Sequence, residues 1–164
     1  YNGLTKRLKN AGAECAAITS IAGHFCIERF VEKSVLTIVD LLSCVRAEVE
    51  NKGYEKIGIL GTKPVMESKF YSVIKSAEIV LPEGDLLEDV HNAYVEMATS
   101  GHASEDQKLV FDAACNQFIT QNKVDAVMLG GTDLALVYNS KNVDFALVDC
   151  AAVHVEELFR LHRN

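Results

Sequence analysis

The residues best suited to chemistry stand in turns that follow short apolar runs. In residues 124–137, VDAVMLGGTDLALV, an apolar run leads into Gly130 and Gly131, and Thr132 and Asp133 follow where a helix can begin. Adjacent glycines let the backbone approach a ligand closely, and the N–H groups at a helix start attract anions. The turn is therefore suited to holding a small anion, although it contains neither a nucleophile nor an obvious base.

Three other turns combine a strand end with a hydroxyl, carboxyl or imidazole group. Ser20 follows the run CAAIT, with His24 four residues later; Thr62 follows KIGILG; and Asp149 follows FALV, with His154 one helical turn beyond it. An imidazole titrates near neutral pH and can exchange protons, whereas a serine hydroxyl is a poor base without a partner. The hydroxyl groups can still bind a carboxylate by hydrogen bonding.

Each of these residues also has an ordinary structural interpretation. A glycine pair makes a tight turn, and Thr132 or Asp133 can cap a helix through its side-chain oxygen. Ser20 can likewise be a turn or cap residue, and each histidine can be a hydrogen-bonded structural residue. Of the two histidines, we take His24 as the better candidate for acid–base work. The residue types alone leave both interpretations open.

The elements that must position these turns alternate along the chain. The apolar periodicity and the capping residues predict strands over residues 15–19, 36–39, 56–60, 78–81, 124–129 and 145–148, and helices over residues 2–10, 24–33, 41–52, 64–74, 86–99, 104–121, 132–138 and 151–162. Strands that alternate with helices of this length predict an α/β fold with parallel sheets and right-handed crossovers. In such folds ligands sit at the carboxyl ends of the strands, where all four turns fall.

The composition excludes several classes of partner. The chain has 164 residues, a net charge of −7 and no apolar stretch long enough to cross a bilayer, so we expect no binding to nucleic acid or to a membrane. The cysteine count is odd and no CxxC occurs, which favours reduced thiols in a cytoplasmic protein over a zinc site. Cys150, next to Asp149, is the alternative source of a reactive thiol. The five cysteines are Cys15, Cys26, Cys44, Cys115 and Cys150.

Four motifs in order, AITSIAGH, GILGTKPVMESKFY, VMLGGTDLAL and FALVDCAAVH, resemble those of the aspartate/glutamate racemase family. The resemblance implies two pseudo-symmetric α/β lobes, each with a parallel sheet and flanking helices, and an active site between them. Residues 1–39 would form part of the first lobe, 40–135 the second, and 136–164 a return to the first. In the family a glycine-rich strand–turn–helix unit opens the first lobe, and it has no counterpart in residues 1–164, so we expect the first lobe to be incomplete.

The resemblance also implies a reaction and the residues that carry it. Family members interconvert L and D amino acids without a cofactor or metal, by proton transfer at the α-carbon between two bases that are usually cysteines. Those two positions fall on Ser20 and Gly131 here, and two polar positions after the first cysteine fall on Ile21 and Ala22. The expected catalytic positions are thus Ser20, Gly131 and His24, and the expected substrate-binding residues are Thr62, Gly130, Thr132, Asp149 and His154.

Three functions follow from these observations. The motif order favours a cofactor-independent amino-acid racemase, whereas the loss of both cysteines favours an inactive homologue or a module that binds a small carboxylate. A third interpretation is an unrelated phosphate-binding α/β domain that uses the Gly61 and Gly130 turns. In the first two cases the partner is a small dicarboxylate or amino acid, and analogy with the family suggests a homodimer.

Overall fold

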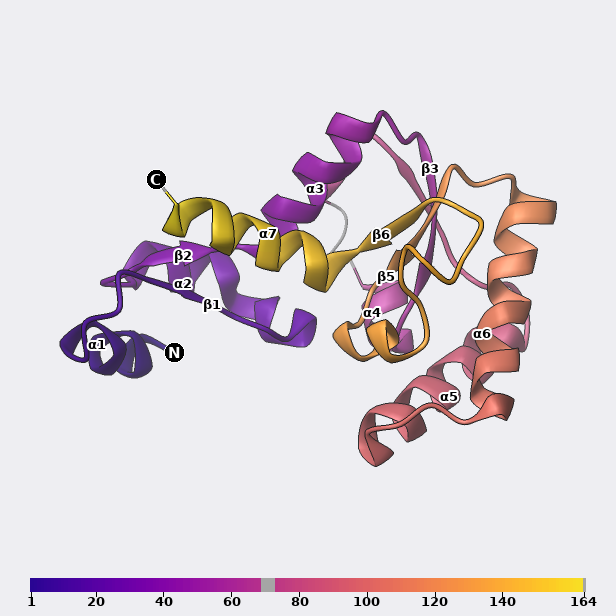
Figure 1. Cartoon of the computed structure of the whole chain (residues 1–164), viewed down its shortest axis with the longest axis horizontal. Helices are drawn as coiled ribbons and strands as arrows, with labels where there is room; N and C mark the ends of the chain where they lie inside the picture. Colours follow the sequence, from indigo (N-terminus) through magenta and orange to yellow (C-terminus); the bar gives the residue numbers. More distant parts are fainter. Residues whose placement is uncertain (69–72, 164) are drawn as a thin grey trace.

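Two sheets, both parallel, organise the chain in the computed structural model, which describes residues 1–68 and 73–163 (Figure 1). The small sheet pairs β1 (Cys15–Ala17) with β2 (Thr37–Val39). The larger sheet has the strand order β4–β3–β5–β6. Its strands are β3 (Lys56–Leu60), β4 (Glu78–Val80), β5 (Ala126–Leu129) and β6 (Leu147–Asp149). The predicted α/β class with parallel sheets is confirmed.

The helices fall into three groups around these sheets. Beside the small sheet lie α1 (Asn2–Asn10), η1 (Ile21–Cys26) and α2 (Ile27–Lys33). Two helices, α3 (Leu41–Lys52) and α7 (Cys150–His162), pack on each other and lead from the small sheet to the larger one (Figure 1). The remaining helices accompany the larger sheet: α4 (Lys63–Glu67), α5 (Leu86–Ser100), α6 (Glu105–Gln117), η3 (Phe118–Asn122) and η4 (Thr132–Leu136).

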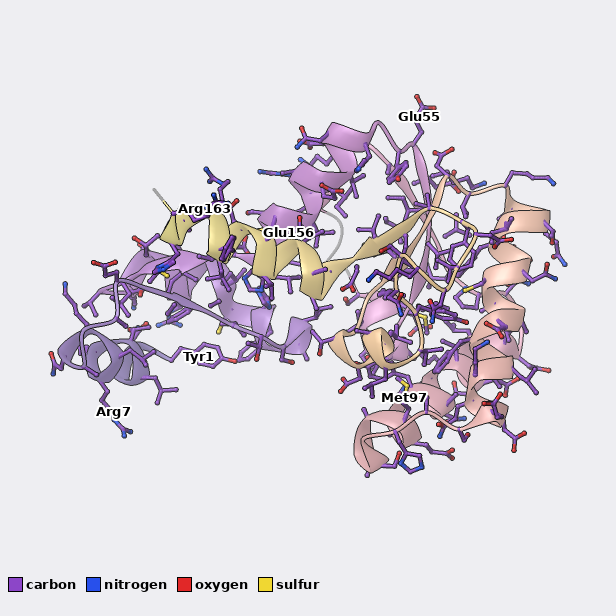
Figure 2. All side chains as sticks on the ribbon, viewed as in Figure 1. Tyr1, Arg7, Glu55, Met97, Glu156 and Arg163 are labelled. Carbon is purple, nitrogen blue, oxygen red and sulfur yellow. The ribbon has the colours of Figure 1, made fainter. Side chains whose placement is uncertain are left out.

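The core belongs to the larger sheet. Every residue of β5 is buried, and in β3 only Lys56 is partly exposed, because helices cover both faces of these central strands. Position 58 requires glycine, because a Cβ there would overlap the ring of Phe118, which is fully buried against the strand. Met97, labelled in Figure 2, is likewise fully buried on α5.

The small sheet is less deeply buried than its sequence suggests. Residues 15–19 were predicted to form a buried strand, but β1 ends at Ala17 and is only half-buried. The side chain of Tyr1 supports this part of the fold, since its ring packs on Phe30 with centroids 5.1 Å apart (Figure 2). The helix predicted over 24–33 starts earlier, as the 3₁₀ turn η1, because the carbonyl oxygen of Ser20 accepts the N–H of Gly23 at 3.0 Å.

Several predicted boundaries are wrong at helix and strand ends. The helix predicted over 64–74 ends at Glu67, Ile74 lies outside it, and positions 69–72 of the predicted helix fall outside the described residues. The helix predicted to reach Gln121 changes at Phe118 into a π-helical turn, which Lys123 closes with a φ of 55°.

The last strand also differs from the prediction. It lies at 147–149 and not at 145–148, and it pairs with β5 in the larger sheet. A boundary at 135/136 would have assigned this strand to the first lobe. The return to the smaller sheet is made by α7, whose residues pack against β2. The lobe limits 1–39, 40–135 and 136–164 stay a prediction.

The predicted helix starts at Asp40 and Ser104 are both present. The Asp40 carboxylate accepts the N–H groups of Leu42 and Ser43 at 3.1 and 3.3 Å. Ser104 and Gln107 form a reciprocal capping box, with hydrogen bonds of 2.9 and 3.2 Å. These caps satisfy N–H groups that a helix start leaves without an intrahelical partner. They therefore fix where the chain turns from strand to helix.

Asp125 ties the beginnings of the two central strands together, and its removal should have a pH-dependent effect. Its Oδ2 accepts the N–H groups of Glu55 and Lys56, each at 2.8 Å, and these bonds lower the pKa of the carboxyl below its ordinary value of about 3.9. A lowered folded-state pKa stabilises the protein above the unfolded-state pKa, and this contribution is lost as pH falls through the folded-state pKa.

We therefore expect Asp125→Ala to lower the urea midpoint at pH 7, and the difference from the unsubstituted protein to shrink below about pH 4. The matched control is Asp144→Ala, which removes another exposed loop carboxylate. Urea unfolding followed by circular dichroism at both pH values measures the effect. A difference that stays constant or grows in acid would contradict the assigned hydrogen bonds.

Candidate functional site

The turns after β3 and β5 meet at one edge of the larger sheet. The register places Leu60 beside Leu129, and the N–H of Gly130 donates to the carbonyl oxygen of Leu60 at 2.7 Å. A Cβ on Gly61 would lie 3.4 Å from the carbonyl carbon of Gly130. Strand β6 then brings Asp149 alongside Leu129. The structure thus assembles the predicted residues of three turns at the carboxyl ends of adjacent strands.

Gly130 is required by this close approach and not by an unusual backbone angle. A Cβ at this residue would lie 2.6 Å from the carbonyl oxygen of Leu60 and 2.9 Å from two side-chain carbons of Ile59. The ends of β3 and β5 are therefore too close together to leave room for a Cβ at residue 130. This geometry explains the first glycine of the pair.

The second glycine is explained by a residue from another element. A Cβ on Gly131 would overlap the hydroxyl group and the ring of Tyr94, which reaches the turn from α5. The Tyr94 hydroxyl donates to Oδ2 of Asp133 at 2.8 Å. Burial, together with this bond to a carboxylate, raises the pKa of Tyr94 well above its ordinary value. The position where a side chain of residue 131 would stand is therefore filled by a neutral hydroxyl.

Ser20 and His24 lie at the end of the small sheet, beside Asp40. Ser20 is exposed at the start of η1, and its side chain makes no cap hydrogen bond. The Nδ1 of His24 lies 2.9 Å from the carbonyl oxygen of Ser20, so Nδ1 carries the proton that is donated. The Nε2 of His24 faces Oδ1 of Asp40 at 3.7 Å, which is beyond a direct hydrogen bond. The imidazole side chain is completely buried.

Two other candidate residues have structural partners. His154 is 4% exposed, and its Nε2 lies 2.8 Å from the carbonyl oxygen of Val39, which connects α7 to the end of β2. Asp149 caps α7, since its Oδ1 accepts the N–H groups of Ala151 and Ala152, both at 3.0 Å. A role in substrate binding stays a prediction for both residues.

The remaining candidate residues flank the glycine turns. Thr62 is half-buried before α4, and its carbonyl oxygen accepts the N–H of Val65 at 2.9 Å. Thr132 is the first residue of η4 and is also half-buried. Both hydroxyl groups lie in turns at the carboxyl end of a strand, which is the place where the fold can present them to a ligand.

Sequence reasoning missed two side chains that shape this edge. Tyr94 and His91 both fall in the helix predicted over residues 86–99, and neither was among the candidate site residues. The Nδ1 of His91 accepts the N–H of Lys63 at 3.2 Å, at the first residue of α4. The signal was the helical spacing: His91 and Tyr94 are three residues apart, so they share one face of α5.

All five cysteines stand outside positions 20 and 131, where the family resemblance places the catalytic thiols. Cys150 is fully buried at the start of α7. Burial raises the pKa of the Cys44 thiol to about 11 and that of Cys115 to about 12, so both stay protonated at neutral pH. Cys15 and Cys26 are half-buried before and after the Ser20 turn, and all five cysteines lie outside disulfides.

Two further features are absent from the described part of the chain. Within residues 1–68 and 73–163, no group of three or more His, Cys, Asp or Glu side chains is arranged to hold a metal ion. No helix in these ranges has the length and the apolar character that crossing a membrane requires.

The arrangement of two parallel sheets with turns at their carboxyl ends defines a class of α/β protein that includes solved amino-acid racemases. An aspartate racemase homologue from Pyrococcus horikoshii has a TM-score of 0.87 at 24% identity, over 99% of this chain and 72% of its own. The aspartate racemase of Picrophilus torridus has a TM-score of 0.69 at 17% identity, over 95% and 67%. The glutamate racemase of Francisella tularensis, solved with D-glutamate, also has a TM-score of 0.69 at 17% identity, over 96% and 60%.

The sequence itself matches the Asp/Glu/Hydantoin racemase family over residues 2–158. The chain therefore belongs to this family, which confirms the resemblance carried by the four motifs.

Proposed function

We propose that the chain binds a small carboxylate, an amino acid or a dicarboxylate, at the carboxyl ends of its strands, and that it does not racemise this ligand by the two-thiol route. The observation that carries the proposal is the overlap between Tyr94 and any side chain at residue 131. Family membership supports the class of ligand, and the racemase of Francisella tularensis was solved with D-glutamate.

The chemistry of racemisation explains why this position matters. Removing a proton from the α-carbon and returning it on the other face requires one acid–base group on each side of the ligand. Ser20 and Gly131 stand at the two expected positions, and neither can serve as a base: a hydroxyl without a partner holds its proton, and glycine has no side chain. The groups that remain, backbone N–H groups and threonine hydroxyls, can bind a carboxylate without transferring a proton.

A racemase that uses another base is the second candidate, and one contact favours it. His24 is the candidate acid–base residue, and its Nε2 lies 3.7 Å from Oδ1 of Asp40. One histidine serves only one face of a ligand, and this ring is buried. We therefore rank this second candidate below carboxylate binding without racemisation.

The binding proposal is tested by thermal unfolding with the L and D forms of aspartate and glutamate. A ligand that binds only the folded state at one hundred times its Kd stabilises that state by about 2.7 kcal/mol, which raises Tm by several degrees for a chain of this size. We expect such a shift for at least one of the four acids, and a smaller shift in Thr132→Val.

The matched control is Thr120→Val, the same substitution on the exposed face of η3. It should leave the ligand-induced shift unchanged. If none of the four acids changes Tm, the proposed ligand class is wrong.

A further inference from the structure

The Tyr94–Asp133 pair has a chemical character that the expected thiol would not have. The proton of the Tyr94 hydroxyl is directed at Oδ2 of Asp133, 2.8 Å away. What the pair can offer a third group is therefore the lone pair of the hydroxyl oxygen and the oxygens of a carboxylate. Both are hydrogen-bond acceptors, and the carboxylate adds a negative charge.

The pair stands at the candidate site because of where residue 131 lies. Gly131 directly follows Gly130, whose N–H bond to the carbonyl oxygen of Leu60 holds the ends of β3 and β5 together. The direction that a side chain of residue 131 would take leads to the Tyr94 hydroxyl. Tyr94 is 8% exposed, so its ring is packed in the core while its polar end reaches the turn. Asp133 is half-buried, in the first turn of η4.

The charge of the pair selects between the two halves of an amino-acid ligand. A ligand carboxylate placed beside Asp133 would be repelled, whereas a protonated amine would donate to the acceptors and be attracted by the charge. Partial burial strengthens both effects, because the effective dielectric constant is lower than in water.

We propose that Tyr94 and Asp133 bind the ammonium group of an α-amino acid, so that the site takes amino acids in preference to dicarboxylates that lack an amine. This inference rests on the proposed function, since it assigns one part of the ligand to one part of that site. Tyr94 fixes one oxygen of Asp133 and excludes a side chain at residue 131, and Asp133 supplies the charge.

The test compares aspartate with succinate, which has the same carbon skeleton without the amine, by isothermal titration calorimetry. We expect the unsubstituted protein to bind aspartate at least tenfold more tightly than succinate. Asp133→Asn should weaken aspartate binding by ten- to a hundredfold, because a charged hydrogen bond is lost, and should leave succinate binding unchanged or tighter. Tyr94→Phe keeps the ring and should reduce the preference for aspartate by a smaller factor.

The chain contains a matched control pair. Tyr138 donates to Oδ1 of Asp112 at 2.6 Å on α6, so Tyr138→Phe removes an equivalent hydrogen bond and should leave the preference unchanged. A preference that survives Asp133→Asn, or that is absent in the unsubstituted protein, would overturn the assignment of the amine. Failure to bind either compound would instead overturn the proposed function and this inference with it.

The position of the pair is tested without any ligand. Gly131→Ala should lower Tm by roughly 3–10 °C, because the added methyl group overlaps Tyr94. Adding Tyr94→Ala in the same chain should remove most of the penalty of Gly131→Ala, so the two substitutions should be strongly non-additive. Additive effects would show that Tyr94 does not fill the side-chain position of residue 131.

Discussion

Gly130→Ala should destabilise the folded protein by about 3 kcal/mol, because the added methyl group would overlap neighbouring atoms. Its nearest neighbour is a backbone atom, the carbonyl oxygen of Leu60 at 2.6 Å, which also accepts the N–H of residue 130. The strand ends would have to separate, and this hydrogen bond would be lost with the contact. A flexible side chain could turn away from the methyl group, but the backbone of a central strand cannot.

Urea unfolding at pH 7 measures the loss, and Gly3→Ala is the matched control. A Cβ on Gly3 meets no atom within 4 Å, and Gly3 lies in α1, where alanine is the better helix former. The control should therefore be neutral or slightly stabilising. If Gly130→Ala costs less than about 1 kcal/mol, the strand ends do not approach as closely as described.

Thermal unfolding of Gly130→Ala with an amino-acid ligand extends the same test to the site. The substitution should also reduce any ligand-induced shift, since the turn that carries Gly131 and Thr132 would move with the strand end.

The architecture was predictable because the strongest patterns are local. The strand at Lys56–Leu60 and the helix that Asp40 starts and Gly53 ends were predicted with their observed limits. The limits of a strand with a continuous apolar run, and of a helix with both caps, follow from the local sequence alone. The family resemblance added the order of the turns, and the parallel register then brought three of them to one edge.

The helix and strand ends that were predicted wrongly are those that tertiary contacts decide. The helix after Ser104 was expected to continue to Gln121, yet it changes at Phe118, whose ring packs against Gly58. No local sequence pattern shows against which distant glycine an aromatic ring will pack. The last strand starts two residues later and ends one residue later than predicted, because its pairing with β5 decides its limits and its propensity does not.

The sequence predicted the turns at the strand ends, but it did not predict the side chain that fills the space beside Gly131. The glycine pair, Thr132 and Asp133 were recognised as a turn that could hold an anion, but the sequence could not show what occupies the space beside Gly131. Tyr94 lies 37 residues earlier, and the spacing on α5 says only that it faces inward. The Tyr94 hydroxyl fills this position because α5 packs against η4 in the folded chain, and the sequence does not show that contact.

The central claim is that this member of a racemase family binds its ligand without transferring the α-proton, and it predicts a large effect. Racemases must accelerate the removal of a very weakly acidic proton, and enzymes typically exceed the uncatalysed rate by a factor of about 10⁶ or more. Without a base at Ser20 or Gly131, that acceleration should be lost. The difference is large enough to be decided by a single measurement.

That measurement is the loss of the α-proton signal of L-aspartate and L-glutamate in deuterated water, followed by proton NMR with the purified protein. A racemase that has both cysteines serves as the positive control. We expect the signal to decay no faster than in a protein-free sample over a day, while the control exchanges within the same period. Rapid exchange by this protein would contradict the claim, and its loss in His24→Gln would then assign the proton transfer to His24.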